Sequence, residues 1–388
     1  MNITTVPSDR QIIIGIDATN IRHGGGITHL SRLMKYADPN LSGISKVIVW
    51  ASNKTLEQLP NKPWLHKKSN SFLEGNFFYR LYWQMFVLQS QLKKYTCNLL
   101  FVPGGSFTVK FKPVVSMNQN LLPFEWKEIF RYKFSLMALK WILLRYTQTS
   151  SFQKSDGIIF LSKFSQNVVL KSLKKNNAKT TIIPHGVEKK FFKKPKKQYS
   201  INHYSINNPY RIIYVSSVDF YKHQWNVVEA VSRLRKIGYP VTLDLYGSGN
   251  KRALKLLKKT ISQIDKSNKF IRYNNEVDYS EIEQIYFSAD LSIFASSCET
   301  FGQIVTESMA SGLPIACSKM SSMSELLGKN AVYFNPLNID DIENSIKKLI
   351  DSEKQRTSIA KKAYQHVRNY SWDETALKTF NFFKEVLE

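Results

Sequence analysis

Residues 296–314 read SSCETFGQIVTESMASGLP and link two apolar runs of the chain. The run before them, Asp290–Ala295, predicts a buried strand, because it is short, apolar and bounded by turn residues. The segment turns at Glu299, enters a helix near Phe301 and leaves through Gly312-Leu313-Pro314 into the next strand. Glu299 is therefore expected at the carboxyl end of a parallel strand, where doubly wound folds bind their ligands.

Similar short β-rich runs recur on both sides of this unit, between longer helical patterns. The first series comprises residues 12–17, 46–50, 98–102, 114–117, 157–161 and 181–184. The second comprises residues 211–215, 241–246, 269–272, 290–295, 313–317 and 331–334. This alternation predicts the α/β class, with two Rossmann-like doubly wound domains facing a cleft.

The predicted boundary between the domains lies in a stretch rich in Lys, Asn and Ser that lacks an apolar period. We expect residues 1–185 to form the first domain, 186–208 a basic linker and 209–370 the second domain. Ser371 is a candidate N-cap, and Glu374 three positions later would complete a capping box. The final helix, 371–388, is expected to pack back on the first domain.

Composition indicates a folded protein of 388 residues, since 43% of them are hydrophobic. Cys97, Cys298 and Cys317 have neither metal-ligand spacing nor enough partners for a disulfide framework, so we expect a cytoplasmic protein. The N-terminal stretch lacks the pattern of a secretion signal. Lys140 and Arg145 interrupt the best candidate for a membrane span, so no crossing of the bilayer is expected.

A net charge of +25 predicts an anionic partner, which could be a membrane, a nucleic acid or a phosphorylated substrate. Phe191 and Phe192 lie within a lysine-rich stretch that contains a single acid, Glu188. Its lysines are residues 171, 174, 175, 179, 189, 190, 193, 194, 196 and 197. One hypothesis is that this stretch, extended by residues 126–146, inserts at an anionic membrane. The alternative is that the phenylalanines pack in the core and the lysines form a solvated face.

Two loops have the composition of a phosphate site. Gly24-Gly25-Gly26 follows the first strand and precedes a helix, so its backbone could approach a diphosphate closely. Lys222 follows the strand 211–215 and precedes a second helix, where a lysine could stabilise a leaving diphosphate. The alternatives are a flexible turn without ligand and a solvated surface lysine.

Glu307 lies about two helical turns beyond Glu299, where a carboxylate can accept hydrogen bonds from a ribose diol. The alternative for either residue is an ordinary surface acid. Taken together, residues 299–307 resemble the E-x7-E signature of the retaining glycosyltransferases of the GT-B fold, especially glycosyltransferase family 4. Other pieces agree in order along nearly the whole chain: Gly24–Gly26, IPHGV at 183–187, Lys222, YGSG at 246–249, SEL at 324–326 and YSW at 370–372.

The resemblance implies that Glu299 contacts the donor sugar and that Glu307 holds the nucleotide ribose. The other donor-binding positions that it implies are Gly25, Gly26, Ser216, Ser217, Lys222, Gly247, Phe301, Gly302 and Gln303. No metal or other cofactor is expected, because Lys222 and helix N-termini can neutralise the developing charge.

Two positions depart from the family's pattern. Ser216-Ser217 stands where relatives commonly have Gly-Arg, so one guanidinium is missing. Asn118 is the nearest match to a His-Asp pair, but an asparagine cannot act as a base at neutral pH. His185 is the remaining catalytic candidate near the cleft, and a role in a turn is its alternative. His23 and His29 flank the Gly-rich loop, and the sequence assigns them no role.

The resulting hypothesis is a retaining glycosyltransferase that moves a hexose-type sugar from a nucleoside-diphosphate sugar to a lipid-linked or saccharide acceptor. Surface polysaccharide synthesis at the inner face of the cell membrane is the expected setting, and the resemblance favours mannosyl or a related hexosyl transfer. One alternative is a GT-B sugar-nucleotide epimerase. Another is a basic nucleic-acid-binding protein, although the sequence shows no RNA-binding signature and leaves the two glutamates unexplained.

Overall fold

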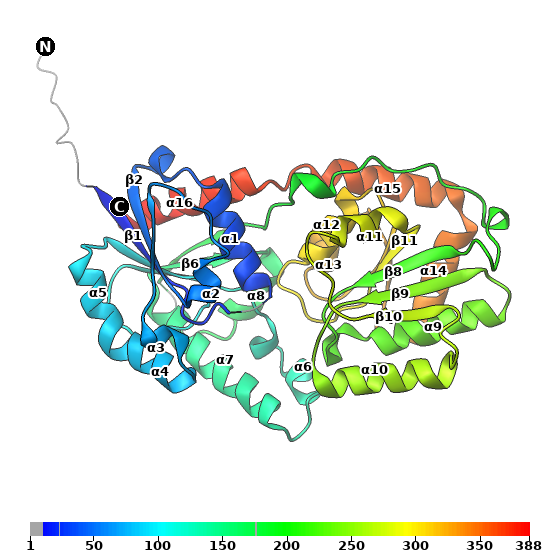
Figure 1. Ribbon diagram of the computed structural model, residues 1–388, viewed down its shortest axis with the longest axis horizontal. Helices are drawn as coiled ribbons and strands as arrows, with labels where there is room; N and C mark the ends of the chain where they lie inside the picture. The colour runs from blue at the N-terminus through cyan, green and yellow to red at the C-terminus, as the bar shows by residue number, and fades with distance from the viewer. Residues whose placement is uncertain (1–10, 23, 175–176) are drawn as a thin grey trace, which may run out of the picture.

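The structure is a computed structural model that describes residues 11–22, 24–174 and 177–388. Two α/β domains lie side by side, and the chain crosses between them at the linker and again before the last helix (Figure 1). Lys175 of the lysine-rich stretch and His23 lie outside the described residues. Within the described part, no helix is both long enough and apolar enough to span a bilayer.

The first domain contains a parallel sheet in the order β3-β2-β1-β4-β5-β6-β7. Its strands are β1 (Ile12–Asp17), β2 (Ile44–Trp50), β3 (Leu65–Lys68), β4 (Leu99–Val102), β5 (Val114–Met117), β6 (Gly157–Phe160) and β7 (Lys179–Ile182). Strand β3 was missed in the sequence because it is a four-residue edge strand, LHKK, in which only Leu65 is buried.

Helices cover both faces of this sheet. They are α1 (Gly25–Tyr36), α2 (Asn53–Leu56), α3 (Ser71–Glu74), α4 (Phe77–Tyr82), α5 (Leu88–Lys94), α6 (Trp126–Phe130), α7 (Leu136–Lys154) and α8 (Lys163–Leu170). A π-helical turn, η2 (Trp83–Val87), joins α4 to α5.

The second domain repeats this plan with a parallel sheet in the order β10-β9-β8-β11-β12-β13. Its strands are β8 (Tyr210–Val215), β9 (Val241–Tyr246), β10 (Ile271–Asn274), β11 (Leu291–Phe294), β12 (Ile315–Ser318) and β13 (Val332–Phe334). Its helices are α9 (Gln224–Lys236), α10 (Lys251–Ile264), α11 (Ile282–Ser288), α12 (Gln303–Ala310), α13 (Met323–Leu327), α14 (Ile339–Asp351) and α15 (Glu353–Val367). The prediction of two doubly wound domains is confirmed.

The linker is packed against the second domain. Phe191 is fully buried between the rings of Tyr279 and Tyr286, and Phe192 packs against Tyr364. The hypothesis that these two phenylalanines insert into a membrane is therefore wrong, and the alternative that they belong to the core is confirmed. The apolar rings are better shielded from water by the neighbouring tyrosines than they would be in an exposed loop.

The last helix, α16 (Trp372–Leu387), crosses back to the first domain (Figure 1). The Ser371 side chain accepts a hydrogen bond from the Glu374 N–H, so the predicted N-cap is confirmed. The other half of the capping box is wrong, because the Glu374 carboxylate pairs with Lys378 at 2.7 Å instead. The Phe383 ring is fully buried with its centroid 5.0 Å from that of Phe101 on β4.

This packing makes α16 a structural part of the first domain. We expect Phe383→Ala to lower the free energy of unfolding by about 3 to 5 kcal/mol, because it leaves a cavity against the sheet. Leu377→Ala, on the exposed side of the same helix, should change it by less than about 0.5 kcal/mol. Urea unfolding measures both values, and equal effects would contradict the packing of α16.

Candidate active site

The predicted phosphate lysine and sugar glutamate meet where the strand order of the second sheet reverses. Lys222 ends the short helix η6 (Phe220–Lys222) after β8, and Glu299 lies in the loop after β11, the neighbouring strand. Their side chains form an ion pair, with 6% of the lysine side chain and 16% of the glutamate side chain exposed. Ligands of open α/β sheets bind at this switch point.

Both members of the ion pair are held by their surroundings. The Ser321 hydroxyl lies 2.6 Å from the backbone N–H nitrogen and 2.6 Å from the carbonyl oxygen of Glu299. The Tyr214 hydroxyl donates a 2.6 Å hydrogen bond to the Lys222 carbonyl. The Lys222 Nζ also lies 4.8 Å from the ring centroid of Phe294, in the range of a cation–π interaction.

Helix α12 begins directly after this loop. Gly302 is its N-cap with φ of 102°, a conformation that favours glycine, and a Cβ there would lie 2.5 Å from the Met323 side chain. Phe301 is buried, and Gln303 is the first helical residue. The N–H groups of this first helical turn therefore lie beside the ion pair, where a helix N-terminus favours an anion.

Glu307 lies within α12 and is 5% exposed. The hydroxyls of Tyr279 and Tyr286 each donate a 3.4 Å hydrogen bond to its carboxylate. Burial raises the pKa of Glu307 to about 8, because the charged form loses its hydration. These tyrosines were not identified from the sequence, since single tyrosines at positions 279 and 286 form no motif.

The loops after β8 and β9 are in close contact. Gly247 has φ of 131°, and a Cβ there would lie 2.2 Å from the Ser216 carbonyl oxygen. The Tyr273 hydroxyl donates to the Gly247 carbonyl at 2.8 Å. Ser216 is buried, whereas Ser217 is exposed beside it. The structure thus brings Ser216 and Gly247 together and leaves Ser217 accessible.

On the first domain, the glycine loop lies at the N-terminus of α1. Gly24 is the N-cap with φ of 66°, and Cβ atoms placed at Gly24 or Gly25 would meet nothing within 4 Å. Gly26 is closer to its neighbours, since a Cβ there would lie 3.2 Å from Ile21. The backbone of Gly24 and Gly25 is therefore open to a ligand, which is the arrangement that a phosphate cradle requires.

Asn118 and His185 follow β5 and β7 of the first sheet, and both side chains are buried. Asn118 Nδ2 donates to the Asn120 carbonyl at 3.0 Å, and its Oδ1 is buried without a hydrogen-bond partner in the described part of the chain. The Nδ1 atoms of His185 and His29 lie 3.0 Å apart, and the His185 ring packs edge-on against Phe301. Burial lowers the pKa of His185 well below its usual range, so this ring is neutral at pH 7.

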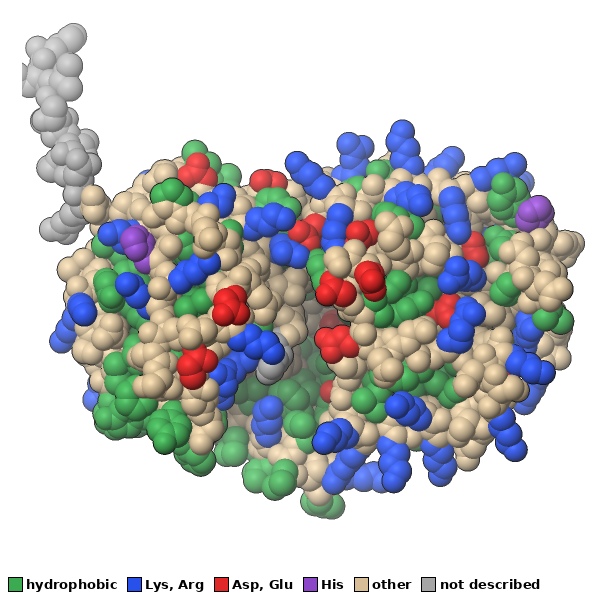
Figure 2. All heavy atoms as spheres, in the orientation of Figure 1, with side chains coloured by type: hydrophobic (Ala, Val, Ile, Leu, Met, Phe, Trp, Pro, Cys, Tyr) green, Lys and Arg blue, Asp and Glu red, His purple; other side chains and the backbone are tan. Residues whose placement is uncertain are grey.

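Contacts between the domains enclose the Glu299 loop. The Ser162 hydroxyl donates to the Thr300 carbonyl at 2.6 Å, and the Thr300 hydroxyl donates to the Gln119 carbonyl at 3.3 Å. The Glu325 carboxylate accepts hydrogen bonds from the backbone N–H groups of Lys163 and Phe164 at the start of α8. A hollow between the two domains is visible in Figure 2. The site is thus built by both domains.

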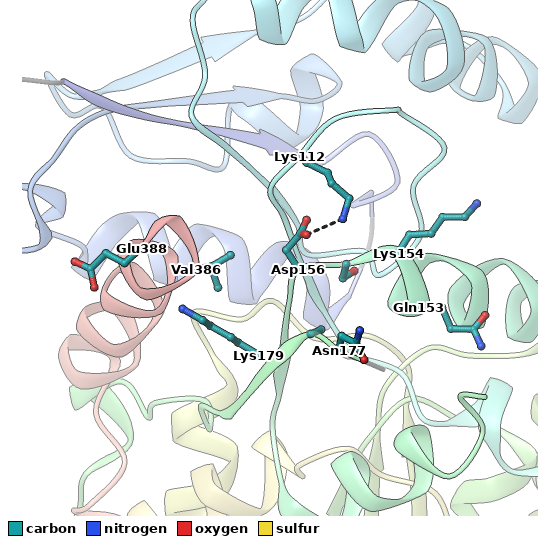
Figure 3. A pocket seen from close by; sticks show the side chains of 10 residues that line it. Lys112, Gln153, Lys154, Asp156, Asn177, Lys179, Val386 and Glu388 are labelled. Atoms are coloured by element: carbon teal, nitrogen blue, oxygen red, sulfur yellow. Dashed lines mark hydrogen bonds and ion pairs between the residues drawn. The ribbon is translucent and has the colours of Figure 1, made fainter. Parts of the chain in front are cut away.

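A cavity of about 740 Å³ lies away from this site (Figure 3). Lys112, Asp156 and Lys179 line it, and they precede or begin β5, β6 and β7. It therefore lies at the amino ends of the strands, opposite the edge where ligands of such sheets bind. Among residues 11–22, 24–174 and 177–388, no group of three or more His, Cys, Asp or Glu side chains could hold a metal ion.

The buried Glu307 carboxyl makes stability depend on pH. Because its folded-state pKa is raised from 4.5 to about 8, its contribution to stability is complete below about pH 4.5 and is lost as the pH rises towards about 8. Glu307→Gln has no carboxyl at this position and should not show this pH dependence. Between about pH 4.5 and 8, the free energy of unfolding of the wild type should therefore fall relative to that of the variant by up to about 1.4 kcal/mol per pH unit. Urea unfolding at several pH values measures it, with the exposed Glu374→Gln as control. Parallel curves for wild type and Glu307→Gln would contradict the raised pKa.

Residues 196–366 match the family model of glycosyl transferases group 1. The sulfoquinovosyl transferase SQD2 of Arabidopsis thaliana is 29% identical over 106 residues, which are 26% of this chain and 21% of that protein. The O-antigen chain mannosyltransferase B of Escherichia coli is 25% identical over 115 residues, 30% of each chain. The chain thus spans less than a third of the length of these two relatives.

Solved structures resemble the whole chain. The complex of Anabaena HepE with UDP and glucose has a TM-score of 0.68 at 16% identity, covering 96% of this chain and 100% of that one. WaaG, a glycosyltransferase involved in lipopolysaccharide biosynthesis, has a TM-score of 0.69 at 12% identity, covering 96% of this chain and 99% of that one. These findings support a glycosyltransferase: the chain has the two-domain GT-B fold, and its second domain matches glycosyl transferases group 1.

Proposed function

We propose that the protein is a retaining glycosyltransferase of family 4 that moves a hexose from a nucleoside-diphosphate sugar to a lipid-linked or saccharide acceptor. The observation that carries the proposal is the Lys222–Glu299 ion pair at the switch point of the second sheet. A cation for the diphosphate and a carboxylate for the sugar hydroxyls are adjacent there, beside the N-terminus of α12.

In this mechanism, Lys222 exchanges its carboxylate partner for the donor diphosphate. The first turn of α12 and the open backbone at Gly24 and Gly25 supply further N–H groups to the phosphates. Glu299, released from the lysine, accepts hydrogen bonds from hydroxyls of the sugar. Lys222 would then balance the charge that develops on the leaving diphosphate, so the proposed reaction needs no metal ion.

Retention follows if the acceptor attacks the face from which the diphosphate leaves. The leaving phosphate, rather than an enzyme carboxylate, then takes the acceptor proton. Asn118 cannot serve as a base, and the neutral His185 ring lies against His29 and Phe301. We therefore assign to His185 the positioning of Phe301, against whose ring it packs, and to Asn118 the acceptance of a hydrogen bond from the substrate at its Oδ1, which has no partner among the described residues.

Glu307 is assigned to the ribose diol of the nucleotide. Tyr279 and Tyr286 orient its carboxylate, and the ribose hydroxyls would replace hydration that burial has removed. Such hydrogen bonds stabilise the charged form, so nucleotide binding should lower the pKa of this carboxyl.

The relatives favour a hexosyl transfer in surface polysaccharide assembly. One of them is an O-antigen chain mannosyltransferase, and one structural neighbour is a glycosyltransferase of lipopolysaccharide biosynthesis. Another neighbour was crystallised with UDP and glucose. Mannose or a related hexose is therefore our proposed sugar, and the inner face of the cell membrane our proposed location. A sugar-nucleotide epimerase, the main alternative, would consume the donor without an acceptor.

Calorimetry with UDP and GDP tests the roles of the two glutamates. Glu307→Gln should weaken binding of the preferred free diphosphate by roughly tenfold or more, because a charge-assisted hydrogen bond contributes about 1.5 to 3 kcal/mol. Glu299→Gln should leave that affinity nearly unchanged and reduce turnover of the sugar nucleotide, since its contact is with the sugar.

Proton release gives an independent readout of the Glu307 role. Titrations near pH 7 in two buffers of different ionisation enthalpy should show more protons released per bound diphosphate by the wild type than by Glu307→Gln, the difference being the proton of the Glu307 carboxyl. Equal weakening by the two variants would contradict the assignment of roles. If neither variant changed binding or turnover, the glycosyltransferase proposal itself would fail.

A further inference from the structure

One side of the first domain exposes a concentration of apolar side chains. Among the described residues, most of the large exposed hydrophobic side chains lie between Phe77 and Tyr146, on α4, η2, α6 and α7 and on the α6–α7 loop. We call this set the aromatic face: Phe77, Phe78, Tyr79, Tyr82, Met85, Phe86, Trp126, Phe130, Phe134, Leu136, Leu139, Leu143 and Tyr146. Hydrophobic side chains gather over α4 and α7 along the lower edge of the first domain in Figure 2.

Helix α7 shows that this exposure has a direction. Leu136, Leu139, Leu143 and Tyr146 follow one another at spacings of three and four residues, so they lie on one side of the helix, and each is at least half exposed. Phe152, farther along α7, is fully buried against the sheet. Helix α7 therefore packs on the protein through one side and exposes apolar side chains on the other. Such a helix is suited to lie in the plane of a membrane–water interface and not to span the membrane.

The segment that carries the aromatic face, residues 77–146, contains far more basic than acidic residues. Between residues 77 and 146 the acids are Glu125 and Glu128, and Glu128 is buried in an ion pair with Arg131. The bases in the same range are Arg80, Lys93, Lys94, Lys110, Lys112, Lys127, Arg131, Lys133, Lys140 and Arg145. Apolar side chains among cations complement an acyl layer covered by anionic headgroups.

We propose that the aromatic face docks on an anionic lipid bilayer and inserts its phenylalanine and leucine side chains among the headgroups. The lysine-rich linker is less suited to this role. Its two phenylalanines are turned into the protein, Lys190 pairs with Glu283, and Lys196 pairs with Asp290.

Two hydrogen bonds connect the elements near the aromatic face with the end of β1 and with the loop that precedes the glycines. Gln84, on the buried side of η2, donates a 2.5 Å hydrogen bond to the carboxylate of Asp17 at the carboxyl end of β1. Arg22, in the loop that leads to the glycines, donates a 2.8 Å hydrogen bond to the Leu73 carbonyl before α4. A bilayer docked on the aromatic face would therefore contact the domain that carries the glycine loop. Resting on the proposed function, this arrangement favours a lipid-linked acceptor over a free saccharide.

Sedimentation of the full chain with lipid vesicles tests the docking face. The probes are vesicles of phosphatidylcholine alone and vesicles containing about one third phosphatidylglycerol, each at low and high salt. The test variant is Phe134→Ser/Leu136→Gln/Leu143→Gln. The matched control is Ile237→Gln/Leu256→Gln/Leu337→Gln, which changes exposed apolar side chains of the second domain.

We expect wild type and control to bind the acidic vesicles, to bind neutral ones more weakly and to lose affinity as salt rises. The test variant should bind acidic vesicles at least about tenfold more weakly, because it replaces the exposed apolar side chains of Phe134, Leu136 and Leu143 with polar ones. Unfolding curves establish that both variants are folded. Binding of UDP or GDP should be unchanged in both, which separates a failure of the docking proposal from a failure of the proposed function.

Equal vesicle binding by wild type, test variant and control would overturn the proposal. So would sedimentation equilibrium showing a wild-type dimer that the test variant alone abolishes, with no vesicle binding by the wild type, because the face would then be an interface between two copies of the chain.

Discussion

The ion pair between Lys222 and Glu299 is the interaction on which the site depends. Removing both charges from water is costly, and their attraction offsets that cost only when the geometry is good and neighbouring groups supply hydrogen bonds. Here the serine at 321 holds the glutamate backbone, and the Tyr214 hydroxyl holds the lysine backbone. Two opposite charges kept together in this way are the basis of the proposed binding of a ligand that bears phosphate and hydroxyl groups.

The same constraint explains why the site needs two domains. The loop carrying Glu299 belongs to the second sheet, yet Ser162 and Gln119 of the first domain bond to its next residue, Thr300. Across the boundary, Tyr132 donates a 2.7 Å hydrogen bond to Asp219, close to Lys222. The segments that carry Glu299 and Lys222 are thus both held by hydrogen bonds from the first domain. A change in the relative orientation of the two domains would therefore alter the site. Helix α16, packed on the first domain after leaving the second, ties the two together a second time.

The first domain differs from the second in the character of its surface. Its helices α4, α6 and α7 and the turn η2 carry exposed aromatic and aliphatic side chains, and Gln84 on the buried side of η2 forms a hydrogen bond with Asp17. Exposed apolar side chains gain no stabilisation from burial in the protein itself. Their concentration on one face therefore indicates an interaction partner that covers them. In the second domain, exposed apolar residues such as Ile237 and Leu256 occur singly.

The sequence by itself determined the two doubly wound sheets, since buried parallel strands are short apolar runs that stand out between helical patterns. It also placed Lys222 and Glu299 at strand ends, because those positions follow directly from the strand assignments. Tertiary structure alone decided that these residues, 77 positions apart, form one ion pair. It likewise decided the tyrosines around Glu307 and the burial of Phe191. Such contacts join segments that are distant in the sequence. Local periodicity does not show which side chains will pack together in the folded chain.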